Sequence, residues 1–181
     1  MESNIQINKG LTIWFTGLSA SGKSTQSELL YKSLQELDFN NVILLDGESM
    51  RDKLKIYEFD SDSREKIGIQ KAKIALDLNK DGKIVLISGI AHKKKWRNDI
   101  RNMLDNYFEI FLDCSLENCI DRDYKGNYKK AISGDLDNFI GISEPYEDSG
   151  GYDLTLDSGI QSVEFCSKKI LKEVLNFIQK I

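Results

Sequence analysis

The sequence is poor in cysteine, and its few cysteines follow no pattern of a special site. They are Cys114, Cys119 and Cys166, and none forms a C-x-x-C pair. Zinc sites of the finger type and redox-active dithiols usually need such a pair. We therefore expect three small buried hydrophobic side chains in a reducing compartment, and no cysteine metal site.

Long apolar runs and an excess of basic residues are also missing. No apolar run approaches the about 20 residues with which a helix crosses a bilayer, and MESNIQINKG at the start lacks a basic segment followed by an apolar one. We therefore expect a cytoplasmic protein without a secretion signal. The 25 Lys and Arg residues against 29 Asp and Glu residues give a net charge of −4, which argues against a nucleic-acid surface. The expected partner is a small molecule, with neither nucleic acid nor membrane.

Short apolar runs alternate with helical patterns along the 181 residues, a length typical of one domain. The apolar runs predict strands, of which the last is the weakest, at 11–16, 41–46, 83–88, 107–113 and 152–157. Apolar residues at helical spacing follow the first run and recur near the end: Leu30, Leu34 and Leu37, then Val163, Cys166, Ile170 and Val174. This alternation predicts one three-layer α/β/α domain over residues 1–181, around a parallel, roughly five-stranded sheet.

One segment, 121–151, is long, polar and punctuated by glycine, and it holds the only proline, Pro145. Loops of this length in compact domains are commonly lids or binding loops. We therefore expect residues 121–151 to form a lid or substrate loop.

The first apolar run leads into GLSASGKST at 17–25, which fits the phosphate-binding pattern G-x-x-x-x-G-K-[ST]. Gly17 and Gly22 let the backbone turn closely around phosphates, and the following helix adds its positive end. Lys23 should reach the β- and γ-phosphates, and the Ser24 hydroxyl should bind Mg²⁺. The other candidate nucleotide contacts in the loop are Ser19, Ala20, Ser21 and Thr25. The alternative, an accidental glycine turn, fits poorly with the strand and helix on either side, so the pattern predicts a P-loop NTPase-type domain.

Two acids follow the second apolar run, in LLDGESMR. Asp46 and Glu48 could both face the magnesium ion and an acceptor hydroxyl, because α/β ligands bind at the carboxyl ends of parallel strands. A carboxylate there can orient or deprotonate the attacking hydroxyl in phosphoryl transfer. Arg51, on the next turn, could bind an anionic acceptor. The alternative is a solvated acidic turn that caps a helix.

Other classes of protein with a phosphate loop, the GTPases and motor ATPases, are less well supported by the sequence. The GTPase pattern N-K-x-D is absent, since 79–82 reads NKDG, and no acid ends the run at 83–88, where motor ATPases often place one. Two alternatives stay open: a nucleotide-dependent switch without transfer activity, and a nucleoside-monophosphate or gluconate-type kinase on the same fold.

Together the motifs resemble the adenylylsulfate kinase family. The resemblance rests on GLSASGKST, on DGESMR, which is similar to the family's D-G-D-N-x-R, and above all on KGNYKKAISGDLDNFIGISEPYE at 125–147. It runs from about residue 10 to about residue 158. It implies ATP with Mg²⁺, transfer of the γ-phosphoryl group to the ribose 3′-hydroxyl of a sulfated nucleotide, and usually a homodimer.

The resemblance also implies roles for single residues. Asp46 and Glu48 match the acids that bind magnesium and activate the acceptor. Matching acceptor contacts are two arginines, two aromatics that sandwich the base and one apolar residue: Arg51, Arg64, Phe59, Phe139 and Ile90. Lys125, Lys129 and Lys130 match lysines of the lid that neutralise charge. Arg122, just before the lid, matches an arginine that contacts the donor nucleotide. For the two aromatics, core packing is the alternative.

The lining nearest the acceptor's far end departs from the family pattern. Glu48 and Ser49 replace an aspartate and an asparagine, Ile67 replaces an asparagine, and Ala91 and His92 replace a serine and a proline. We therefore expect retained kinase chemistry with an altered acceptor. A kinase of bacterial capsule modification resembles this family, and it phosphorylates cytidine diphosphoramidate. That compound and adenylylsulfate are the two candidate acceptors.

His92 is the only histidine of the chain. We interpret it as a surface histidine that opens a helix, and the alternative, based on its place in the family's substrate loop, is an acceptor contact shared with Ala91. We interpret KKKWR at 93–97 as a solvated helix face, which could also attract a doubly charged acceptor.

Overall fold

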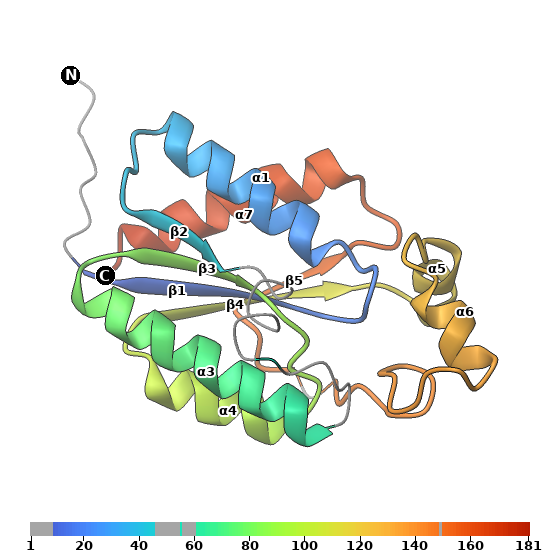
Figure 1. The fold of residues 1–181 in the computed structure, drawn as a ribbon. Helices are drawn as coiled ribbons and strands as arrows, with labels where there is room; N and C mark the ends of the chain where they lie inside the picture. The colour runs from blue at the N-terminus through green and yellow to red at the C-terminus, as the bar shows by residue number, and fades with distance from the viewer. Residues whose placement is uncertain (1–8, 46–54, 56–60, 149) are drawn as a thin grey trace.

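The computed structural model describes residues 9–45, 55, 61–148 and 150–181 (Figure 1). In these residues a parallel sheet has the strand order β2-β3-β1-β4-β5. Its strands are β1 Leu11–Thr16, β2 Val42–Leu45, β3 Ile84–Ser88, β4 Tyr107–Asp113 and β5 Leu154–Asp157. The helices are α1 Lys23–Glu36, α3 Ser61–Lys80, α4 Lys94–Met103, α5 Leu116–Asp121, α6 Asn127–Ile132 and α7 Val163–Ile178. The predicted fold class and its five parallel strands are confirmed, with β5 starting two residues later than expected.

The sheet is covered on both faces, with α1 and α7 on one side and α3 and α4 on the other (Figure 1). The core residues that pack between the sheet and the helix pair α1 and α7 include Phe15, Leu30, Leu34 and Ile170, all buried. The core on the other face includes Trp14, Ala75, Ile87 and Ile100. Burial on both faces explains why the central strands are continuous apolar runs. None of the helices in the described residues is long and apolar enough to cross a membrane.

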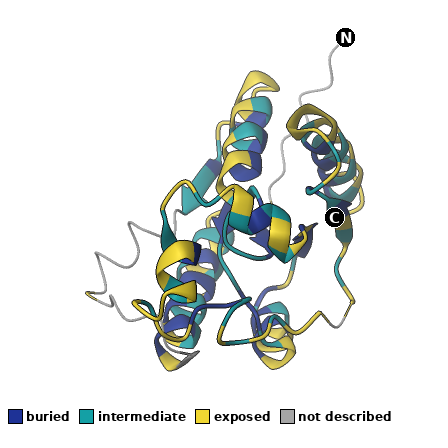
Figure 2. Cartoon of the chain, turned by 90° about the vertical axis from the view of Figure 1, so that its right-hand side faces the viewer, coloured by how far each residue is buried: buried dark blue, intermediate teal, exposed yellow. Residues whose placement is uncertain are grey.

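Helical spacing located both amphipathic helices correctly but overstated their buried faces. Leu37, one residue beyond the end of α1, and Val163, the first residue of α7, are about half exposed. Both lie at helix ends, where the apolar stripe runs past the sheet and has nothing to pack against. Figure 2 shows the same pattern, with buried residues on the inner sides of the helices and exposed residues outside.

Strand order places a ligand crevice at the end of β1. The chain leaves β1 towards β2 at one edge of the sheet, and after β3 it crosses to β4 on the other side of β1. In open α/β sheets, ligands bind where the strand order reverses in this way, outside the carboxyl ends of the strands. The loop 17–22 follows β1 directly and therefore lies in this crevice.

The segment 121–151 is less loop-like than its composition suggests. It contains α6, and it closes with an isolated bridge between Ile140 and Glu144. Tyr128 of α6 is fully buried and packs with Phe139, Cys114 and Cys119 into a small separate core. Figure 1 shows α5 and α6 together at one end of the sheet. A buried tyrosine therefore anchors a helix within the segment, and its expected role as a lid or substrate loop stays a prediction.

Candidate active site

The loop between β1 and α1 has the backbone that a phosphate cradle needs. Gly17 adopts a φ of 137° and Gly22 a φ of 97°, both in the region that favours glycine. At Gly17 a Cβ atom would lie 2.6 Å from the carbonyl oxygen of Leu112, so no side chain fits there. Ala20 also has a positive φ, of 58°, a backbone conformation that glycine adopts more readily than residues with a side chain.

Lys23 opens α1 and crosses the loop. Its ammonium donates a hydrogen bond to the carbonyl of Leu18. Desolvation lowers the pKa of Lys23 to about 8, and repulsion from Lys71 and Arg64 adds to the lowering. A cation held in this way gains most when an anion arrives, because a phosphate relieves both effects.

Ser24, the next residue, supplies one oxygen for a metal ion. The exposed Ser24 hydroxyl lies 3.4 Å from the hydroxyl of Ser88, at the end of β3. In the described part of the chain no three His, Cys, Asp or Glu side chains group into a metal cage. Asp46, the other predicted ligand, lies outside the described residues.

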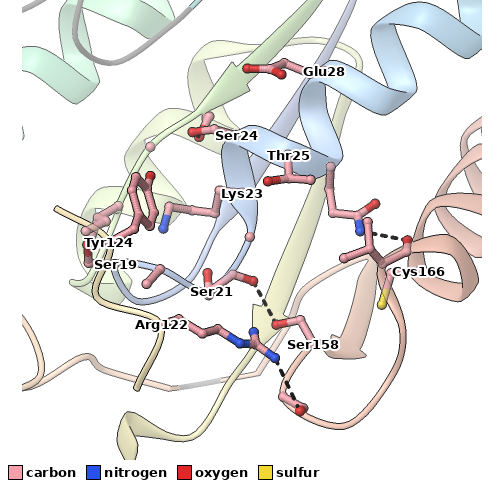
Figure 3. Close-up of a pocket in the computed structure, with 18 of the residues that line it drawn as sticks. Ser19, Ser21, Lys23, Ser24, Thr25, Glu28, Arg122, Tyr124, Ser158 and Cys166 are labelled. Carbon is pink, nitrogen blue, oxygen red and sulfur yellow. Dashed lines mark hydrogen bonds between the residues drawn. The ribbon is translucent and has the colours of Figure 1, made fainter. Parts of the chain in front are cut away.

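A pocket of about 890 Å³ surrounds the loop (Figure 3). Because β3 and β4 flank β1 on opposite sides, the pocket has two flanks. One flank combines the start of α3 with the end of β3 and is lined by Arg64, Ile67, Gly68, Lys71 and Ser88–Ile90. The other combines the start of the 121–151 segment with the loop after β5 and is lined by Arg122, Tyr124, Lys125, Asn127 and Ser158–Val163.

Hydrogen bonds tie the second flank to the phosphate loop. The Ser158 hydroxyl donates to the carbonyl of Ser21 at 2.9 Å, and Gln26 of α1 donates to the carbonyl of Val163 at 3.0 Å (Figure 3). Arg122 donates to the carbonyl of Gly159 at 3.4 Å. The loop after β5 is thereby fixed beside the phosphate cradle, where a donor nucleotide would extend from its phosphates.

The pocket is cationic although the whole chain is acidic. Five basic side chains line it: Lys23, Arg64, Lys71, Arg122 and Lys125. Glu28 is the single acidic residue among the described lining residues. Such a concentration of positive charge in a recess attracts and holds anionic ligands. The arrangement suits two phosphate-bearing molecules better than one neutral substrate.

Most of the predicted donor-side residues lie together in this pocket. The structure brings Ser19–Thr25, Arg122 and Lys125 into its lining. Lys129 and Lys130 are exposed on α6 and are not among the lining residues. Three buried free cysteines confirm the interpretation of cysteine as a small hydrophobic residue, and Cys166 also reaches the pocket wall.

The predicted acceptor-side residues divide into three groups. Arg64 and Ile90 line the pocket, as does the departure Ile67, and the Arg64 guanidinium donates to the carbonyl of Asn138 at 3.4 Å. Phe139 is buried with its ring edge-on to Tyr128, 4.9 Å between centroids, and does not line the pocket. The remaining predicted residues lie outside the described part of the chain: Asp46, Glu48, Ser49, Arg51 and Phe59.

Ala91 and His92 are buried beneath the pocket wall and do not line it. The backbone amide of Ala91 donates to the Thr16 hydroxyl, and the carbonyl of His92 accepts from the amide of Glu147 at 2.8 Å. The interpretation of His92 as a surface histidine is wrong, because the imidazole is 1% exposed and lies edge-on to Trp96. The solvated helix face at 93–97 is correct for Lys94 and Lys95 only, since Trp96 and Arg97 are buried.

Burial keeps His92 neutral. Desolvation lowers the pKa of His92 to about 4, with a further contribution from Arg64, while the carboxylate of Glu144, 3.5 Å from Nε2, opposes both. In the unfolded chain a histidine takes up its proton near pH 6.5. The native state binds this proton less well, so the free energy of unfolding should fall as pH drops from 6.5 towards 4.

Replacing His92 with glutamine tests this linkage. Between pH 7 and pH 4.5, the titration of His92 should lower the free energy of unfolding of the wild type by about 2 kcal/mol. The glutamine variant should lack this part of the decrease. Urea denaturation of both proteins at pH 7 and pH 4.5 measures the difference, because other groups titrate alike in the two proteins. Parallel stability curves over this range would contradict the low pKa of His92.

Sequence reasoning missed one feature of the pocket, the buried Lys71. Lys71 is 2% exposed and its ammonium donates to the carbonyl of Ser88 at 2.9 Å. A signal was present, because Lys71 lies seven residues after Arg64 and so shares its face of α3.

Comparison with known proteins decides the family. The family model described as adenylylsulphate kinase matches residues 9–157 of the chain. The chain belongs to the adenylylsulphate kinase family. Family members are phosphotransferases that act on a hydroxyl and use ATP, with Mg²⁺ as the usual associated ion.

Two curated relatives and one solved structure are informative. Cytidine diphosphoramidate kinase of Campylobacter jejuni is 34% identical over 168 residues, which cover 90% of this chain and 98% of that protein. Adenylyl-sulfate kinase of Halothermothrix orenii is 36% identical over 165 residues, covering 91% and 89%. The APS kinase of Mycobacterium tuberculosis, solved in complex with AMPPNP and APS, superposes with a TM-score of 0.85 at 31% identity, covering 92% of this chain and 98% of that one.

Proposed function

We propose that the chain transfers the γ-phosphoryl group of ATP to the ribose 3′-hydroxyl of a nucleotide whose 5′ phosphate carries a second linked acidic group. The observation that carries this proposal is the two-flanked cationic pocket around Lys23. One flank receives the donor beside Arg122 and the loop after β5, and the other offers Arg64 and Ile90 to the acceptor.

The chemistry follows from these positions. The amides of the loop, the start of α1 and Lys23 hold the β- and γ-phosphates, and Mg²⁺ bound with the help of Ser24 offsets their charge when present. The acceptor 3′-oxygen forms the new bond to the γ-phosphorus while the bond to the β,γ-bridging oxygen breaks. We assign Asp46, with Glu48 beside it, as the group that takes the proton of the hydroxyl. Lys125 and Lys129 neutralise charge as the lid segment 121–151 closes.

We propose cytidine diphosphoramidate as the acceptor, with adenylylsulfate as the alternative. In favour of the first is the similarity to a kinase of that name along 98% of its length. The lining points the same way at one position, since Ile67 lines the pocket and is apolar where the family pattern has an asparagine. In favour of the second is the comparable identity to adenylyl-sulfate kinase. A base that stacks on an aromatic side chain such as Phe59, which lies outside the described residues, would tolerate either nucleobase.

A coupled assay of ADP release with each acceptor decides between the two. We expect turnover of cytidine diphosphoramidate with a KM well below that of adenylylsulfate. The 3′-phosphorylated product, identified by mass spectrometry, excludes simple ATP hydrolysis. Efficient turnover of adenylylsulfate with none of the cytidine compound would reverse the assignment. Slow hydrolysis of ATP that neither acceptor stimulates would point to a nucleotide switch.

We further propose that the protein works as a cytoplasmic homodimer formed by single-domain chains. Sedimentation velocity of the purified protein tests the dimer.

A further inference from the structure

One face of α3 carries more positive charge into the pocket than the family resemblance implies. Arg64, Ile67, Gly68 and Lys71 are spaced at i, i+3, i+4 and i+7, so they share this face, and all four line the pocket. Arg64 is 7% exposed and Lys71 is 2% exposed. Two buried cations therefore stand two helical turns apart on the acceptor flank.

The ammonium of Lys71 has a fixed position at the end of β3. It donates to the carbonyl of Ser88, while the indole nitrogen of Trp14 donates to the carbonyl of Gly89 at 3.1 Å. The Ser88 hydroxyl in turn lies 3.4 Å from that of Ser24. Lys71 thus lies between the arginine of the acceptor flank and the place where the phosphoryl group is transferred.

Glycine at position 89 leaves room beside this ammonium. A Cβ atom at Gly89 would lie 3.2 Å from Nζ of Lys71 and 3.4 Å from the Trp14 ring, which is close packing on both sides. Gly89 does not have the positive φ that would explain glycine by backbone conformation. The close approach of a buried cation is the more direct explanation.

We propose that Lys71 is an acceptor-binding residue that contacts the linked acidic groups of the acceptor nucleotide together with Arg64. This inference rests on the proposed function and adds a residue to its acceptor site. It also accounts for the change at Ile67, which replaces the asparagine of the family pattern on the same face of α3. One turn further along that face, Lys71 supplies a charged donor in place of a neutral one, which suits an acceptor with two negative charges.

Replacing Lys71 with methionine removes the charge and keeps the length of the buried side chain. We expect KM for the acceptor, tested as cytidine diphosphoramidate and as adenylylsulfate, to rise about tenfold to a hundredfold, the usual effect of losing a hydrogen bond to a charged group. The affinity for AMPPNP should stay within about threefold. Lys71→Arg should recover part of the loss, because it keeps the charge.

Two further variants separate ligand contact from structural support. Lys73→Met makes the same change on the exposed side of α3 and should alter neither affinity. Gly89→Ala should displace the ammonium without removing it, since the end of a lysine side chain can move, and should raise acceptor KM by a smaller factor. Thermal denaturation confirms that each variant is folded.

The outcomes distinguish this inference from the function on which it rests. If the wild type phosphorylates neither compound, the proposed function fails and the role of Lys71 fails with it. If the wild type turns over either compound and folded Lys71→Met keeps its acceptor KM within twofold, the role of Lys71 alone is refuted. An equal loss of AMPPNP affinity would instead make Lys71 a support of the β3 end.

Discussion

Replacing Lys23 with methionine should lower kcat by about 10³-fold, because a preorganised cation at the transferred phosphate stabilises charge that develops in the transition state. Methionine keeps the length and apolar stem of the side chain, so the loop 17–22 should keep its shape. Single-turnover transfer with saturating MgATP measures the chemical step. Retention of more than a tenth of the wild-type rate would mean that Lys23 does not contact the transferred group.

The lowered pKa of Lys23 gives this residue a second, independent signature. Below pH 8 the ammonium is protonated with and without nucleotide, so the Kd of AMPPNP should not vary with pH. Above pH 8 the free protein loses the proton, which nucleotide binding must restore because phosphates raise the pKa of Lys23. Affinity should then fall by up to tenfold per pH unit. Titration calorimetry at pH 9 in two buffers of different ionisation enthalpy should show proton uptake.

The Lys23→Met variant is the control for this linkage. It should bind AMPPNP more weakly, and its Kd should not rise between pH 8 and pH 9.5. A wild-type Kd that is flat over the same range would contradict the lowered pKa, whatever the kinetic effect of the substitution.

The parts of the fold that sequence predicted are those with a local physical cause. Strand β1 is a continuous apolar run because helices cover both of its faces, and the loop that follows needs glycine where φ is positive or a side chain would meet Leu112. A reader of the sequence can recognise both conditions without knowing any contact across the chain. The residues that the loop contributes to the pocket, Ser19–Thr25, were therefore predicted as a group.

Residues whose position depends on distant partners were predicted less well. Lysine is nearly always solvated, so nothing in the residue type singled out Lys71, which is buried by α3 meeting the end of β3. His92 precedes three lysines and looks exposed, yet Trp96 and Glu144 enclose it. The buried, edge-on packing of Phe139 depends on Tyr128, which a helix in the lid segment brings to it. Each case involves a contact between elements that local pattern does not encode.

Replacing Asp46 with asparagine should lower kcat by about 10²- to 10⁴-fold, the usual range for loss of a general base. Asparagine has nearly the same shape, but it can neither take the proton of the acceptor hydroxyl nor carry charge towards Mg²⁺. The Kd of AMPPNP should stay within about threefold, because the loop 17–22 and Lys23 hold the phosphates. Asp99→Asn, on the exposed face of α4, makes the same change away from the pocket and should have no effect.

The same substitution separates the catalytic role of Asp46 from a capping role. Asparagine caps helices about as well as aspartate, so an acidic turn that only caps a helix would lose neither stability nor activity. Measuring kcat as a function of Mg²⁺ concentration divides the effect further. A rate that recovers at high Mg²⁺ makes Asp46 chiefly a metal ligand, whereas a rate that stays low makes it the base. Unchanged kcat at ordinary Mg²⁺ would remove Asp46 from the mechanism and leave Glu48 as the acid to test.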